Sequence, residues 1–95
     1  MPQTRTGYFP TALASKYLQQ LCKHFAHKVD VRMEGERAEV AFPMGPAQLS
    51  AAPEGLHAVV SGATAEDAAR AQGIIDSHLV RFAFREGFER MRWDD

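Results

Sequence analysis

Apolar residues recur at helical spacing in two segments of the chain. Turned at about 100° per residue, the apolar positions of each segment gather into one stripe. The first stripe consists of Ala14, Leu18, Leu21, Cys22 and Phe25, and the second of Ala68, Ala71, Ile75, Leu79 and Phe82. Such a stripe is typical of an amphipathic helix that buries one face. The pattern therefore predicts one helix at Ala12–His27 and another from residue 65 to Arg85 or Glu86.

Capping signals support these helix ends. Pro10-Thr11 precedes the first helix, and Thr11 is expected to accept a hydrogen bond as its N-cap. Thr64 is expected to cap the second helix, with Asp67 three residues later in a capping-box-like pair. Gly87 is expected to end that helix, because glycine readily adopts the left-handed conformation of a C-terminal stop.

Shorter segments alternate apolar and polar residues with a period of two, which predicts strands. The expected strands are residues 3–9, 29–33, 37–42, 48–52, 56–61 and 88–93. Glu34-Gly35-Glu36 is expected to join the second and third strands in a hairpin. In the fifth strand, the alternation puts Leu56, Ala58 and Val60 on one side.

The resulting order is β-α-β-β-β-β-α-β, which indicates an α+β fold. We expect a two-layer sandwich, with a mainly antiparallel sheet of five to six strands and both helices on one face. Residues 1–95 are expected to form a single domain. The other face of the sheet is either solvated or paired with a second copy.

Composition and charge narrow the classes of function. The 95 residues are 45% hydrophobic and 24% charged, as in ordinary globular proteins. The net charge of −1 gives no general attraction to nucleic acid or to an anionic membrane. No apolar stretch approaches the roughly 20 residues of a membrane span. The single cysteine, Cys22, and the absence of a signal-peptide pattern predict a cytoplasmic protein.

Two histidines are the first candidate ligand-binding residues. His24 and His78 each border the apolar stripe of their helix, so their rings would approach if the helices pack side by side. His24 and His27 are three residues apart and could reach one metal ion. The favoured interpretation is structural, because such histidines usually bond a backbone carbonyl or a neighbour. Cys22 has no partner cysteine, so no zinc signature supports His24, His27 and His78 as metal ligands.

The second candidate group lies at the end of the second helix and consists of Arg81, Arg85 and Glu86. Arg81 and Arg85 are four residues apart and share a helix flank with His78. Two arginines and a histidine could form a site for phosphate or carboxylate. The favoured interpretation is the structural one, in which Arg85 pairs with a carboxylate of the sheet and Arg81 is solvated.

Nothing in the sequence indicates catalysis or a cofactor. The serines lack the context of a nucleophile elbow, and neither GxGxxG nor GxxxxGK occurs. Cys22 lies on an apolar stripe, where a cysteine behaves as a small hydrophobic residue.

Two blocks of sequence carry a resemblance to a known family. Residues 21–28 (LCKHFAHK) and 78–86 (HLVRFAFRE), followed by Trp93, resemble a family of small bacterial proteins of unknown function. Some relatives are associated with flavin-dependent siderophore-interacting proteins, which implies a link to iron handling. The resemblance implies no catalytic or binding residues.

These observations predict a non-catalytic binding or accessory domain for a small anionic ligand or a protein partner. One alternative is a metal- or haem-linked role in iron or siderophore handling, with His24 and His78 as ligands. Another is a structural homodimer that uses a sheet face or edge.

Overall fold

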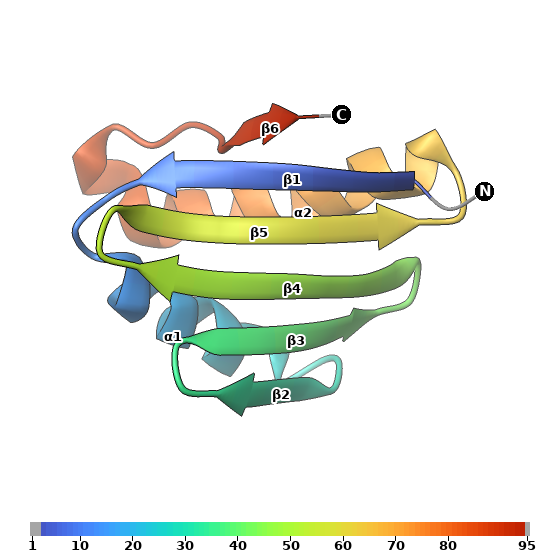
Figure 1. Cartoon of the computed structure of the whole chain (residues 1–95), viewed down its shortest axis with the longest axis horizontal. Coiled ribbons are helices and arrows are strands. Elements are labelled where there is room, and N and C mark those ends of the chain that lie inside the picture. Colours follow the sequence, from blue (N-terminus) through green and yellow to red (C-terminus); the bar gives the residue numbers. More distant parts are fainter. Residues whose placement is uncertain (1–2, 95) are drawn as a thin grey trace.

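The chain forms one antiparallel sheet covered on one face by two helices. The computed structural model describes residues 3–94. The elements are β1 (Gln3–Pro10), α1 (Ala14–Phe25), β2 (Val31–Glu34), β3 (Arg37–Phe42), β4 (Gly45–Ala52), β5 (Gly55–Gly62), α2 (Ala65–Ala83), the 3₁₀ helix η1 (Phe84–Glu86) and β6 (Arg92–Asp94). The six strands lie in the order β2-β3-β4-β5-β1-β6 (Figure 1). The α+β fold and the order of its elements are as the sequence predicts.

The core lies between the helix layer and the face of the sheet that the helices cover. Its largest fully buried side chains are Leu18, Leu21, Val40, Leu49, Leu56, Val60, Ile75 and Leu79. They come from both helices and from the three central hairpin strands, so the two apolar stripes and the strand alternation meet in one cluster. In β5 the predicted alternation is confirmed, with Leu56, Ala58 and Val60 buried and His57 on the opposite face.

The β-hairpins and the return of β1 fix the register of the sheet. β2 and β3 pair from Val31↔Val40 to Glu34↔Arg37, around a turn in which Gly35 has a φ of 60°. This is the hairpin that the glycine predicts. β5 pairs along its length with β1, from Gln3↔Gly62 to Pro10↔Gly55, and also with β4. β5 therefore joins the N-terminal strand to the hairpins formed by β2, β3 and β4.

The predicted start and end of α1 are both wrong, and so is the predicted start of β2. Thr11 is not the N-cap: Leu13 holds that position, and the Thr11 hydroxyl accepts from the Leu13 amide at 3.0 Å in the preceding turn. The helix ends at Phe25 because the amides of Lys28 and Val29 both donate to the Phe25 carbonyl at 2.9 Å. That turn also keeps Val29 out of the ladder, so β2 begins at Val31.

The second helix is capped as predicted but ends earlier. The Thr64 hydroxyl accepts from the Asp67 amide at 3.1 Å. The α-helix stops at Ala83 and tightens into the 3₁₀ turn η1, which is a common way to satisfy the last carbonyls of a helix. Gly87 follows with a φ of 72°, which confirms the predicted glycine stop.

Two further strands differ from their predicted bounds by more than one residue at an end. β4 begins at Gly45 rather than Gln48, with Pro46 near its start, where a missing amide is tolerated. The last strand was expected at 88–93, yet only Arg92–Asp94 pair with β1. The side chains of Phe88 and Met91 are both buried, and the Met91 amide donates to Asp76 of α2. Residues 88–91 therefore pack against the helix layer instead of extending the ladder.

Candidate functional site

The antiparallel packing of the two helices brings His24 and His78 together. His24 lies in the last turn of α1 and His78 in the second half of α2, and their ring centroids are 4.7 Å apart. The His78 ring also contacts Phe25 edge-on, with a centroid separation of 5.1 Å. Both rings are half-buried. The structure thus places the two histidines side by side, as the position of each beside its apolar stripe suggests.

His78 is oriented by its own helix. Its Nδ1 lies 2.6 Å from the carbonyl oxygen of Ile74, one turn earlier. A carbonyl can only accept a hydrogen bond, so Nδ1 carries the proton and donates it. The neutral ring therefore has its lone pair on Nε2. That nitrogen accepts a hydrogen bond when the ring is neutral and donates one when the ring is protonated.

Basic side chains lie near His24. Its pKa is lowered from the ordinary histidine value, first by desolvation and then by the charges of His78 and Arg81, with smaller effects from Lys28 and His27. All four charged groups that cause this shift are basic. The Arg81 side chain is exposed to solvent beside the histidine pair. His24, His78 and Arg81 together are called the histidine–arginine cluster below.

Arg85 and Glu86 have other contacts. The Arg85 guanidinium lies over the ring of Phe84, 5.8 Å from its centroid. Glu86 accepts from the Thr11 hydroxyl at 2.9 and 3.0 Å and from the Tyr17 hydroxyl, at the opposite end of α1 from His24. The structure therefore groups Arg81 with the histidines and uses Glu86 to join η1 to the start of α1.

Tyr17 is buried beneath this junction. Desolvation, its hydrogen bond to Glu86 and the charge of that carboxylate raise the pKa of Tyr17 to about 12. The phenol consequently stays protonated and donates to Glu86. This contact holds the 3₁₀ turn η1 against α1, and it is a structural feature that the sequence patterns did not indicate.

The metal-binding interpretation has His24 and His78 at its centre. Within residues 3–94, no group of three or more histidine, cysteine, aspartate or glutamate side chains is placed to hold one ion. Cys22 is a buried free thiol, and desolvation raises its pKa. A raised pKa keeps the thiol protonated and weakens it as a metal ligand or nucleophile.

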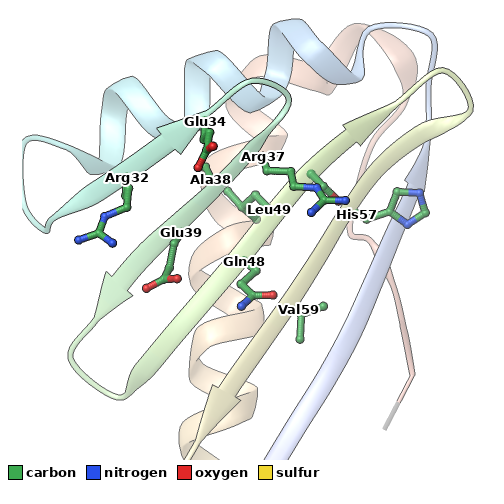
Figure 2. A pocket seen from close by; sticks show the side chains of 10 residues that line it. Arg32, Glu34, Arg37, Ala38, Glu39, Gln48, Leu49, His57 and Val59 are labelled. Carbon is green, nitrogen blue, oxygen red and sulfur yellow. The ribbon is translucent and has the colours of Figure 1, made fainter.

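A second feature lies on the face of the sheet that carries no helix, called the open face below. A shallow depression of about 380 Å³ there is bordered by charged and polar side chains (Figure 2). Its polar lining residues are Arg32, Glu34, Arg37, Glu39, Gln48, Ser50 and His57. Sequence reasoning missed this surface, although opposite charges two residues apart on exposed strands were a visible signal.

Asp76 is a further side chain that sequence reasoning missed. Its carboxylate, in the middle of α2, accepts from the Met91 amide and from the Trp93 indole, each at 2.9 Å. Desolvation raises the pKa of Asp76, and these two hydrogen bonds oppose that rise. Asp76 therefore holds the C-terminal segment against the helix layer, a structural role.

Both sequence blocks, residues 21–28 and 78–86, lie within a match to a known protein family. The profile of the DUF2218 family, described as an uncharacterized protein conserved in bacteria, matches residues 6–94. The chain belongs to this family. The resemblance seen in the sequence is thereby confirmed at the level of the family, whose description gives no function to DUF2218 domains.

The fold is similar to that of a protein whose structure has been solved. The NMR structure of PA4090 from Pseudomonas aeruginosa has a TM-score of 0.79 and 28% sequence identity, over 96% of this chain and 94% of that one. No curated protein matches the chain. Among residues 3–94, none of the helices combines the length and apolar character needed to cross a membrane.

Proposed function

We propose that this DUF2218 domain is a non-catalytic binding domain whose histidine–arginine cluster takes a small oxyanion, a phosphate or carboxylate. The observation that carries the proposal is the contact of His24 with His78, 4.7 Å between ring centroids, in a field made by basic groups alone. Desolvation and the basic neighbours disfavour protonation of the His24 ring. An oxyanion removes that penalty, because it accepts hydrogen bonds from both imidazoles and from Arg81.

The chemistry of the three side chains favours an anion with several oxygens. Arginine presents a planar array of donors that matches phosphate and carboxylate. His78 Nε2 is free of the backbone contact that holds Nδ1 and becomes a donor on protonation. Binding should therefore take up protons and strengthen as the pH falls from 8 to 6, through the range where imidazoles titrate.

Isothermal titration with inorganic phosphate and with citrate, at pH 6.0 and 8.0, tests the proposal. We expect binding at pH 6.0 with proton uptake, measured as a dependence of the heat on the ionisation enthalpy of the buffer. His24→Gln and Arg81→Gln should each weaken binding about tenfold, the size expected for one charge-assisted hydrogen bond.

Two matched variants control for general charge effects. His57→Gln removes a histidine on the open face, and Arg70→Gln removes an exposed arginine near the start of α2. Both should bind the anions as the wild type does. Absence of binding at pH 6.0, or equal losses in the control variants, would contradict an anion site at the histidine–arginine cluster.

A metal-linked role in iron or siderophore handling is a second candidate, favoured by one observation. The donation from His78 Nδ1 to the Ile74 carbonyl leaves Nε2 as the lone-pair nitrogen, the arrangement usual for metal-binding histidines. Titration with Fe²⁺, Zn²⁺ and haem, followed by absorbance and calorimetry, separates the two candidates. Metal binding that is lost in His24→Ala/His78→Ala supports the metal role, whereas anion binding without metal binding removes it.

We also propose a cytoplasmic location and action of residues 1–95 as one domain. A single buried, reduced cysteine suits a reducing compartment. Residues 1, 2 and 95 lie outside the described part of the chain. Fractionation of cells that express the tagged chain tests the location, and recovery of the tag in membrane or secreted fractions would refute it.

A further inference from the structure

The open face of the sheet carries its charges in a repeated arrangement. Three strands each present one arginine and one acidic residue on this face, two positions apart, and all six side chains are exposed. The pairs are Arg32 and Glu34 on β2, Arg37 and Glu39 on β3, and Arg92 and Asp94 on β6. Because alternate residues of a strand share a face, both members of each pair point away from the helices.

The strand register arranges these side chains in two rows across the sheet. Glu34 lies opposite Arg37 in one row, and Arg32 lies opposite Glu39 in the next. At the other edge, Arg92 lies beside Tyr8 in the first row, and Asp94 lies beside Thr6 in the second. In every charged strand, the first-row charge is therefore opposite in sign to the second-row charge.

Between these charged strands, neither row contains a lysine, arginine, aspartate or glutamate. In the first row the register runs from Tyr8 through His57 to Ser50, and in the second from Thr6 through Val59 to Gln48. The Tyr8 and His57 rings contact each other, with centroids 4.8 Å apart. The open face thus has a middle without fixed charges and charged margins, which is the usual anatomy of a protein interface.

The ion pairs among residues 3–94 do not include the charged side chains of this face. Within residues 3–94, none of the six charged side chains makes a hydrogen bond or ion pair, although four of them face each other across β2 and β3. Figure 2 shows the side chains that line the depression, among them the four charged ones of β2 and β3, with Arg37 extending toward His57. Their charge is available to an outside partner.

We propose that the open face binds a second copy of this chain, sheet against sheet. The two-fold axis lies in the interface and runs across the strands, between the two rows. This operation sets each first-row charge against the second-row charge of the same strand in the other copy. Arg37 then faces Glu39 of the second copy. In the same way, Glu34 faces Arg32 of the second copy, and Arg92 faces Asp94. All six charges of each copy therefore meet opposite charges.

The size of the face suits this occupant. Figure 1 looks down the shortest axis of the molecule and shows the sheet in front of the helices, so the open face spans the longer extents of 35 and 24 Å. A standard interface buries roughly 800 Å² on each partner. Paired sheets lie about 10 Å apart, a gap that the facing arginine and glutamate side chains can bridge.

Sedimentation equilibrium of the full chain over a range of concentrations tests the proposal. We expect a monomer–dimer equilibrium whose dissociation constant rises with salt, because charged contacts are screened. Arg37→Glu places like charges at two symmetric contacts and should raise the dissociation constant at least about tenfold. Arg70→Glu, a reversal of similar kind on the helix layer, should leave it unchanged.

A compensating variant separates interface charge from folding. Exchanging all four charges of β2 and β3 (Arg32→Glu, Glu34→Arg, Arg37→Glu and Glu39→Arg) keeps opposite charges across the hairpin and across the proposed interface. It should restore the dimer that Arg37→Glu weakens, with circular dichroism confirming the fold of each variant. A monomer at every concentration, or a dimer that ignores both changes, overturns the proposal. This result is independent of anion binding at the histidine–arginine cluster.

Discussion

Gly7 of β1 packs against the ring of Trp93 in β6. A Cβ atom at this position would lie 2.7 Å from two ring carbons of Trp93, closer than any normal contact. Gly7→Ala should therefore displace the ring and disturb its hydrogen bond to Asp76. We expect a loss of about 1–3 kcal/mol in the free energy of unfolding, measured by urea denaturation, as for other overpacked sites. A variant of unchanged stability would show that the ring moves freely.

Tyr17 makes the fold sensitive to alkaline pH. In the unfolded chain the phenol ionises near pH 10, whereas in the fold its pKa is about 12. Between these values the unfolded chain binds fewer protons than the folded chain, so the stabilisation present below pH 10 is lost as the pH rises toward 12.

The variant Tyr17→Phe tests this linkage. It should cost on the order of 1 kcal/mol at pH 7, because the hydrogen bond to Glu86 is lost. Its melting temperature should also fall less steeply than that of the wild type above pH 10. Parallel curves for the two proteins would contradict the raised pKa.

Individual residues were predicted well where the signal is local. Thr64 and Gly87 occupy the positions that their backbone chemistry indicates. The hydrogen bond between Thr11 and Glu86 was not predicted, because the two residues lie 75 positions apart in the sequence. Each of them also resembles an ordinary surface residue. A capping pattern cannot show that a threonine hydroxyl has a carboxylate partner from another element.

At the scale of elements, β6 depends on α2 as much as on β1. Only three residues of β6 pair with β1, while Asp76 binds both the Met91 amide and the Trp93 indole. Asp76→Ala should release this segment. Because Trp93 is the only tryptophan, its fluorescence reports directly on the release.

We expect a red shift of the emission and a loss of about 1–3 kcal/mol, the cost of leaving donors unpaired. Glu66→Ala, an exposed acidic position in the first turn of α2, serves as the control and should leave the emission unchanged. Emission from Asp76→Ala at the wild-type wavelength would mean that β1 holds β6 without the helix.

Periodicity located all six strands and both helices, but their ends depended on tertiary contacts. The alternation of residues 88–93 is that of a strand, yet burial of Phe88 and Met91 against the helix layer overrides it. Likewise, α1 ends where the amides of Lys28 and Val29 donate to the Phe25 carbonyl, and the helical pattern does not reveal these hydrogen bonds. Hydrophobic spacing therefore predicts which elements form better than where they end.

For the whole molecule, the sequence predicted the two layers but not which polar groups would meet. His24 and His78 were predicted to approach only if the helices pack side by side, and the antiparallel packing of α1 and α2 brings them together. Arg85, an equal candidate by spacing, instead lies over Phe84. The two rows on the open face require the register of six strands, which no single segment contains.

The central claim is that the histidine–arginine cluster binds an oxyanion, and NMR titration of the four histidine rings tests it most directly. Sulfate is the suitable probe, because its charge stays constant over the titration. Without sulfate, the pKa of His24 should lie below about 6.5, owing to desolvation and the nearby basic groups. Saturating sulfate should raise the His24 pKa and shift the His78 resonances, while leaving the His57 resonances unmoved. A His24 pKa insensitive to sulfate, or equal responses from all four rings, would contradict the claim.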